Sequence, residues 1–208
     1  MTRSMTDGDV EQLIAAARQI DREQLGDLLQ MYRNYLTILA STQLSERLRR
    51  RVSPSDVVQE AMLAAHRDFE KFRGCSEREF LSWLRQVLIR TIHHLVDTHL
   101  RAQRRDIRRE VSIEQMGAAL DQSAVQLGGF LADPGPSPSA PVRRREAAVE
   151  MANRLSQLSP DYRDVIVMRT LQGLSFDEVA TRMERSAGAV RMLWLRAIEK
   201  FKQVYEAE

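Results

Sequence analysis

The sequence contains little cysteine, glycine and proline, and it has no long apolar run. The single cysteine, Cys75, excludes an internal disulfide and a cysteine-based zinc knuckle, and it is typical of a reducing compartment. No segment approaches the roughly 18 apolar residues of a membrane span, and residues 1–9 lack the apolar core of a signal peptide. These absences predict a cytoplasmic protein that is neither exported nor embedded in a membrane.

Lysine is also scarce, and the net charge is small. Lysine occurs only at positions 71, 200 and 202, so arginine supplies 28 of the 31 basic side chains. The planar guanidinium suits phosphates and base edges, although a GC-rich genome would produce the same excess of arginine. The 31 basic and 29 acidic residues leave +2 at pH 7, so binding to nucleic acid must depend on where the charges lie.

The 208 residues, 43% of them apolar, suffice for one or two small folded domains. Four of the six prolines fall within residues 133–141, which predicts a linker. Apolar residues on both sides recur at helical spacing, and β-branched runs bounded by turns are missing. We expect an all-α fold with helical domains over 10–110 and 143–205, joined by a linker over 111–142. The weak periodicity of 111–132 predicts a loosely structured extension of that linker.

The first domain is predicted to consist of four helices. Two of them cover 10–20 and 25–40 and serve mainly as core. A third begins after Ser53, because a serine cap, a proline and an acid follow one another there, and it ends at Gly74. Ser76 and Glu79 form a capping box that starts the fourth, which has an apolar face and a basic end running to Arg109.

The second domain is predicted to contain four more helices. They cover about 146–157, the segment from Ser159 to Gly173, a helix that starts at the capping box of Ser175 and Glu178, and one from Ser186 onward. A short turn at residues 184–185 joins the last two. This is the layout of a helix-turn-helix, whose second helix enters the major groove of DNA.

The last helix has one face that we expect to point away from the core. It carries Arg191, Met192, Leu195, Arg196 and Glu199. The arginines suit guanine edges or phosphates, the apolar pair suits thymine methyl groups, and the helix start at 186–188 suits a phosphate. An ordinary helical hairpin with a solvated face is the alternative, but a face meant only for water rarely carries Met and Leu.

Two further features of the sequence bear on function. The helix after Ser53 carries Asp56, Gln59, Glu60, Leu63 and Arg67 opposite its apolar stripe. This pattern fits protein docking, or simply a solvated face with one exposed leucine.

Histidines 93, 94 and 99 suggest a metal site. We reject it because His93 and His94 point about 100° apart and no cysteine or acid pair completes a ligand set. We expect no cofactor, and this basic helix better suits phosphates or unstacked bases.

Six strings in order, placed on both sides of the Pro-rich segment, resemble the extracytoplasmic-function (ECF) sigma factors of the sigma-70 family, bacterial subunits that direct RNA polymerase to promoters. The strings are Asp56-Val-Val-Gln-Glu60, Phe69-Glu-Lys-Phe-Arg-Gly74, Phe80-Leu-Ser-Trp-Leu84 with the basic tail 101–106, Leu158-Ser-Pro-Asp-Tyr-Arg163, Gly173-Leu-Ser-Phe-Asp-Glu-Val-Ala180, and Ser186-Ala-Gly-Ala-Val-Arg191 followed by Arg196-Ala197. The resemblance implies that the two domains are sigma regions 2 and 4.

The resemblance also implies roles for individual residues. Docking on the β′ subunit of core RNA polymerase falls to Asp56, Gln59, Glu60 and Leu63. Contact with the melted −10 element falls to Arg90, Thr91, His93, His94, Arg101, Arg104 and Arg105. Reading of the −35 duplex falls to Arg169, Arg185, Ser186, Arg191, Met192, Leu195 and Arg196. Core polymerase (β′ and β subunits) and promoter DNA are the implied partners, and an anti-sigma protein is a further one.

The sequence therefore predicts a transcription initiation factor and no enzyme, because no nucleotide-binding loop or nucleophile–base pair is present. The main alternative is a dimeric helix-turn-helix regulator that binds operators without being a polymerase subunit. That alternative predicts tight operator binding without polymerase, whereas a sigma factor needs core polymerase for promoter-specific transcription.

Overall fold

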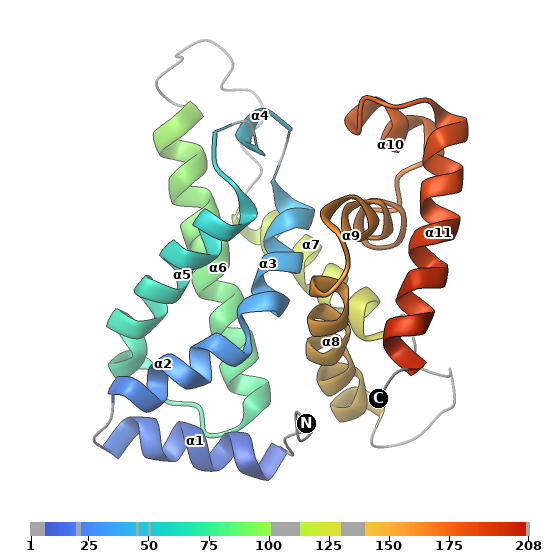
Figure 1. The fold of residues 1–208 in the computed structure, drawn as a ribbon. Helices are drawn as coiled ribbons and strands as arrows, with labels where there is room; N and C mark the ends of the chain where they lie inside the picture. The colour runs from blue at the N-terminus through green and yellow to red at the C-terminus, as the bar shows by residue number, and fades with distance from the viewer. Residues whose placement is uncertain are drawn as a thin grey trace. The chain divides into compact units, whose positions relative to one another are not determined.

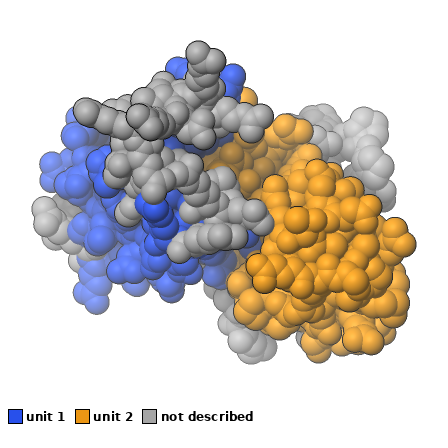
Figure 2. All heavy atoms as spheres, turned by 90° about the horizontal axis from the view of Figure 1, so that it is seen from above, with its two compact units in different colours: residues 1–40, 47–117 blue, residues 41–46, 118–208 orange. Residues whose placement is uncertain are grey.

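The structure is a computed structural model that describes residues 7–19, 22–44, 46–49, 51–100, 113–129 and 140–206. Throughout these ranges the chain forms helices and short connections, and they contain no strand (Figure 1). This confirms the expected all-α fold. The chain divides into two compact units, which are Met1–Ala40 with Arg47–Gly117 and Ser41–Glu46 with Ala118–Glu208 (Figure 2). No helix in the described part is both long enough and apolar enough to span a membrane.

The first part of the chain contains six helices and a short 3-10 turn within the described ranges. They are α1 (Asp7–Gln19), α2 (Arg22–Met31), α3 (Arg33–Gln43), α4 (Glu46–Arg49), α5 (Pro54–Asp68), the turn Phe69–Lys71 and α6 (Glu77–Leu100). The single helix expected over 25–40 was wrong, since the chain breaks at Tyr32, whose N–H donates to the Leu29 carbonyl at 3.1 Å. The break accompanies a buried hydrogen bond of 2.7 Å from the Tyr32 hydroxyl to Glu77 Oε1 at the start of α6.

Both predicted helix starts in this unit are confirmed. The Ser53 hydroxyl accepts from the Asp56 N–H at 3.1 Å, and Asp56 Oδ2 accepts from the Ser53 N–H at 3.0 Å. At α6, Glu79 Oε2 accepts from the Ser76 N–H at 3.1 Å. The start of α6 and the 3-10 turn after α5 contribute to an aromatic cluster of Tyr32, Phe69, Phe72, Phe80 and Trp83, whose contacting ring centroids lie 5.2–6.4 Å apart.

The second part of the chain contains five helices and a π-helical segment in the residues described. They are α7 (Ile113–Gly129), α8 (Ala140–Ser156), α9 (Pro160–Ile166), the π segment Val167–Leu171, α10 (Phe176–Arg182) and α11 (Ala187–Glu206). Gly173 follows the π segment at φ 65°, a conformation that glycine adopts without strain, and it ends this helix as predicted.

The prediction of a loosely structured segment at 111–132 was wrong for residues 113–129, which form α7. Met116, Leu120, Ser123 and Leu127 lie one helical turn apart in succession, and all four are buried. This stripe outweighs the low helix propensity of Gly117 and Gly128, because burial of an apolar face decides helix formation more than propensity does. The expected boundaries of the two functional domains remain a prediction.

The turn between α10 and α11 has the geometry of a Schellman motif. The Arg185 N–H donates to the Ala180 carbonyl at 3.0 Å, and the Glu184 N–H donates to the Thr181 carbonyl at 3.4 Å. Glu184 takes the left-handed position with φ 53°, where glycine is usual. α11 then starts on Ser186, whose hydroxyl accepts from the Ala189 N–H at 3.2 Å. Together these contacts complete the predicted helix-turn-helix.

Candidate nucleic-acid and protein interfaces

The outward face of α11 is as expected. Val190, Ala197 and Phe201 are buried, whereas Met192 and Leu195 are 50% and 54% exposed. Arg191 and Arg196 flank them and are also exposed. We call these four residues, Arg191, Met192, Leu195 and Arg196, the α11 surface. Exposed apolar side chains between arginines are suited to the edges and phosphates of a DNA major groove.

Two predicted site residues at the start of α11 already have partners within the chain. Arg185 Nη2 lies 2.5 Å from Asp161 Oδ2, and both side chains are partly exposed. The Ser186 hydroxyl serves as the helix cap. Arg185 must therefore exchange an ion pair with a carboxylate for any contact with a phosphate.

Arg169 is only partly exposed, and its guanidinium already has contacts within the chain. It is half-buried in the π segment, where Nη1 donates to the Leu174 carbonyl. Its Cζ stands 4.2 Å from the centroid of the Phe176 ring. The structure thus assigns Arg169 to bracing the loop before α10, and it brings in Phe176, which the sequence analysis did not single out.

The predicted docking residues share one face of α5. Asp56, Gln59, Glu60 and Leu63 are all exposed, and Leu63 is 66% exposed. The opposite face packs into the unit through Val57, Val58, Ala61 and Ala65. We call the four exposed residues the α5 surface. It combines an apolar side chain with two acids, which suits a basic and partly apolar protein partner.

Asp56 has a structural role in addition. Its carboxylate accepts hydrogen bonds from the Ser53 hydroxyl at 2.7 Å and from the Ser53 N–H at 3.0 Å. These bonds, that of the side chain first, lower the pKa of Asp56 below its ordinary value and keep the carboxylate charged.

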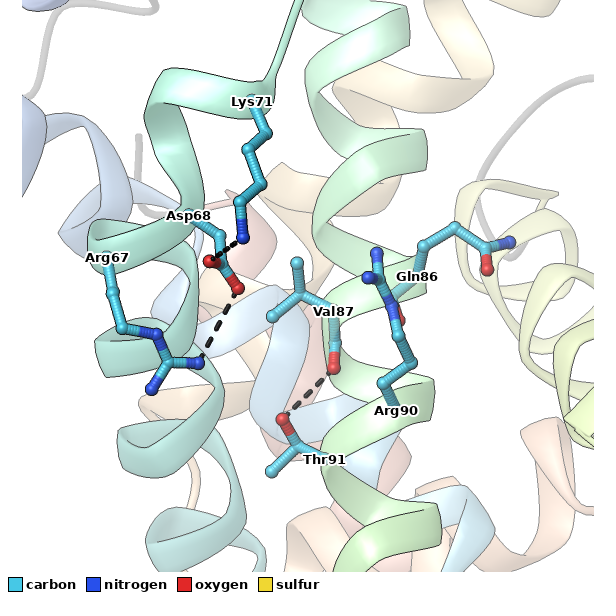
Figure 3. A network of polar contacts seen from close by, with 7 residues as sticks. All are labelled: Arg67, Asp68, Lys71, Gln86, Val87, Arg90 and Thr91. Atoms are coloured by element: carbon cyan, nitrogen blue, oxygen red, sulfur yellow. Dashed lines mark hydrogen bonds and ion pairs between the residues drawn. The ribbon is translucent and has the colours of Figure 1, made fainter.

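Of the predicted −10 residues on α6, three are at least partly exposed and one is buried. Arg90 and His94 are exposed, and His93 is half-buried with Nδ1 3.7 Å from Asp97 Oδ2. Thr91 is buried and donates its hydroxyl proton to the Val87 carbonyl at 3.0 Å, on the side of α6 turned toward α5 (Figure 3). The Thr91 side chain therefore lies in the core of this structure. Arg101, Arg104 and Arg105 lie outside the described residues.

Two cations lie at the end of α5 and in the 3-10 turn that follows it, of which the sequence analysis noted only Arg67. Arg67 and Lys71 are exposed and flank Asp68, at 3.5 Å and 2.8 Å (Figure 3). Lys71, mainly through its hydrogen bond, lowers the pKa of Asp68. In the sequence, the acid with a cation on either side within residues 67–71 could have predicted this charged group. Among the residues that the structure describes, no group of three or more His, Cys, Asp or Glu side chains is placed to hold a metal ion.

A helix-turn-helix with an exposed basic and apolar face is typical of DNA-binding transcription factors. The model of the ECF sigma factor family matches residues 7–206, so this chain belongs to that family. The protein is a transcription initiation factor that directs RNA polymerase to promoters. This favours a sigma factor over a dimeric operator-binding regulator.

The chain is similar to several sigma factors over most of its length. It is 28% identical over 200 residues to the ECF RNA polymerase sigma-E factor of Haemophilus influenzae, covering 96% of this chain and 95% of that protein. It is 29% identical over 184 residues to the sigma-E factor of Escherichia coli strain K12, covering 86% and 88%. It is 32% identical over 145 residues to the sigma-H factor of Pseudomonas aeruginosa, covering 69% and 68%. A solved structure, CnrH in complex with the cytosolic domain of CnrY, matches with a TM-score of 0.32 and 21% identity over 95% of this chain and 97% of that one.

Proposed function

We propose that the α11 surface reads the −35 element as duplex DNA, within a second functional domain over 143–205. The observation that supports this most is the exposure of Met192 and Leu195 between Arg191 and Arg196, at the start of a helix that follows a tight turn. Arginine reads guanine through two hydrogen bonds, and apolar side chains contact the thymine methyl group. Arg185 joins them once it leaves Asp161, and the backbone at 186–188 meets a phosphate.

We propose that the first functional domain, over 10–110, binds core polymerase and the melted −10 strand. The α5 surface docks on the β′ subunit, and the exposed Arg90 and His94, with His93, contact the unstacked bases. Arg101, Arg104 and Arg105 add charge for the phosphates. Binding to polymerase and to the −35 duplex offsets the few kcal/mol per step that unstacking costs.

The chain performs no catalysis in this scheme and works where the polymerase works, in the bacterial cytoplasm. The β subunit is a second polymerase contact, and residues 111–142 connect the two functional domains. An anti-sigma protein is a further partner, and it would compete with polymerase for the α5 surface or with DNA for the α11 surface.

Run-off transcription tests this function directly. The purified chain is added to bacterial core polymerase with a library of promoter fragments, and transcripts are sequenced. We expect a defined subset of promoters to be transcribed only when both the chain and core polymerase are present. Specific transcription that needs no added chain, or tight palindromic operator binding without polymerase, would contradict the proposal.

Charge reversal tests the docking role of the α5 surface. Glu60→Lys is expected to weaken the complex with core polymerase at least fivefold in a fluorescence titration, because opposed charges at an interface become like charges. Glu70→Lys, which reverses an exposed acid of the 3-10 turn, is the matched control. Equal affinities for the two variants would remove Glu60 from the docking surface.

A substitution of Arg191 tests whether this side chain reads a base. Arg191→Ala is expected to cost about 1–3 kcal/mol at one base pair of the −35 element and to relax the preference there. Lys202→Ala, which removes an exposed cation from the same helix, should leave the base profile intact. A profile unchanged by Arg191→Ala would show that this side chain reads no base.

A further inference from the structure

Phe176 lies at the first position of α10, beside the helix that carries the α11 surface. The capping box fixes the backbone just before it, since the Ser175 N–H donates to Glu178 Oε2 at 2.7 Å and the Glu178 N–H donates to the Ser175 hydroxyl at 3.2 Å. Trp194 of α11 meets the Phe176 ring edge to face, with centroids 6.0 Å apart and planes at 80°. The ring is therefore held from both helices of the helix-turn-helix.

Two arginines contact this one ring. Arg169 lies with Cζ 4.2 Å from the Phe176 centroid, and its bond to the Leu174 carbonyl fixes its guanidinium. The exposed Arg191 has its Cζ 5.6 Å from the same centroid. Both distances fall within the roughly 6 Å over which a cation is attracted to an aromatic face. Arg191 and Trp194 are three residues apart on α11, so neighbouring side chains of that helix meet the same ring.

The contact between Arg191 and the Phe176 ring bears on how an arginine recognises a base. An exposed arginine populates many rotamers, and only those that aim both donors at a guanine edge make the two-bond contact. A ring against the guanidinium restricts these rotamers before DNA arrives, so less conformational freedom is lost on binding. Arg169 keeps the ring in place from the side of the π segment.

We propose that Phe176 is a positioning residue for the Arg191 guanidinium, and that it thereby sets the base preference of the α11 surface without itself contacting DNA. The proposal rests on the proposed reading of duplex DNA by Arg191 and adds a determinant of its specificity.

The test replaces Phe176 in the full chain by phenylalanines with increasing numbers of ring fluorines, which weaken cation–π attraction while nearly preserving shape. Each protein is assembled with core polymerase, and run-off transcription is measured over a −35 library. Between phenylalanine and pentafluorophenylalanine, the preference at the base pair read by Arg191 is expected to fall about two- to fivefold. Phe176→Tyr, which keeps the ring, should retain it.

The same series in an Arg191→Ala background separates the possible causes. There, fluorination is expected to leave the base profile unchanged, and thermal unfolding of each protein reports whether the fold is kept. A uniform loss of transcription with an unchanged profile would assign Phe176 a structural role only, and a profile that still changes without Arg191 would assign the effect to another side chain. Either result overturns the proposal.

A different result would contradict the proposed reading of DNA by Arg191. If Arg191→Ala leaves the profile of the wild-type background unchanged, reading by Arg191 is wrong and the positioning role falls with it. If Arg191→Ala alters the profile while fluorination of Phe176 does not, only the positioning role is wrong.

Discussion

Arg185 is held by a carboxylate in the free chain, so one acid opposes its proposed contact with DNA. Asp161→Asn keeps the shape of the side chain and removes the ion pair of 2.5 Å. We expect the variant holoenzyme to bind promoter DNA more tightly by at most about fivefold, since an exposed pair stores only roughly 0.2–1 kcal/mol. Promoter affinity measured at fixed salt checks this.

The matched control for Asp161 is Asp177→Asn, which removes an exposed acid from α10. It changes the net charge equally and leaves the Arg185 contact in place. If both variants tighten binding to the same degree, general charge and not the release of Arg185 is the cause.

For individual residues, the sequence predicted which side chains are exposed better than which groups they contact. Helical periodicity alone placed Leu63, Met192 and Leu195 on the outside, because position around a helix follows from spacing. The same rule also places Thr91 on the inward face of α6, one turn after Val87, whose carbonyl accepts its hydroxyl proton. It could not show that Arg169 rests on Phe176. That contact depends on how the π segment packs against α10, and spacing within one helix does not contain that information.

The turn of the helix-turn-helix carries a strained residue. Glu184 occupies the left-handed region with φ 53°, which costs a residue with a Cβ about 1–2 kcal/mol relative to glycine. Glu184→Gly is expected to raise the free energy of unfolding by up to about 1 kcal/mol, because the greater freedom of glycine in the unfolded chain offsets part of the gain. Urea unfolding of the full chain measures the change.

Glu184→Gln is the control, since it removes the charge but keeps the Cβ. It should leave stability within about 0.5 kcal/mol of wild type, as surface substitutions usually do. Equal stabilities of the glycine and glutamine variants would mean that the turn stores no backbone strain.

The three capping boxes predict the response of the helices to acid. The pKa values of Asp56 and Glu178 are lowered by hydrogen bonds from the cap serine, and that of Glu79 is lowered first by the backbone N–H of Cys75 and then by Ser76. A carboxyl whose folded pKa is lowered stabilises the fold above its unfolded pKa, and this contribution is lost as pH falls through the folded pKa. We expect stability to fall below about pH 4.5, the ordinary value for Glu, in thermal unfolding across a pH series.

Ser175→Ala isolates one of these boxes. Removing the cap should cost about 1 kcal/mol at neutral pH. The Ser175 side chain is also the largest cause of the lowered Glu178 pKa, so the deficit should shrink in acid. A deficit that is constant with pH would show that the Ser175 hydroxyl does not contribute to the lowered Glu178 pKa.

Among the elements, helix starts were easier to predict than helix continuity. Ser53, Ser76, Ser175 and Ser186 each form the expected cap, because the motif lies within one turn of sequence. The break at Tyr32 coincides with a hydrogen bond to Glu77, 45 residues away, which local spacing does not predict. α7 was missed because its glycines weaken the local signal while its buried stripe depends on neighbours elsewhere in the chain.

For the whole molecule, the α5 surface and the α11 surface belong to different compact units with separate cores. Effects of substitutions at sites without shared contacts usually add within about 0.5 kcal/mol. Glu60→Lys and Arg191→Ala together are therefore expected to reduce promoter-specific transcription by the product of their separate factors. A double variant much less impaired than that product would indicate that docking and reading are coupled.

The composition of the whole chain does not predict its function, whereas the order of its sequence motifs does. A net charge of +2 gives no hint of DNA binding, because exposed arginines on α11 are offset by acids elsewhere. The six strings that resemble ECF sigma factors span both units, and the family match over residues 7–206 agrees with them. The roles of individual site residues remain predictions, since they depend on partners that bind the free surfaces.

A substitution of Asp56 would alter two things at once, the cap of α5 and the proposed docking contact. One of its oxygens is committed to Ser53, so replacing the residue would loosen the first turn of α5 at the same moment as it altered the proposed contact with polymerase. A mutant screen scored on transcription would rank Asp56 above Glu60 and Leu63 for reasons unrelated to affinity. Ser53→Ala, which disturbs the turn but keeps the acid, is the companion that lets such a ranking be interpreted.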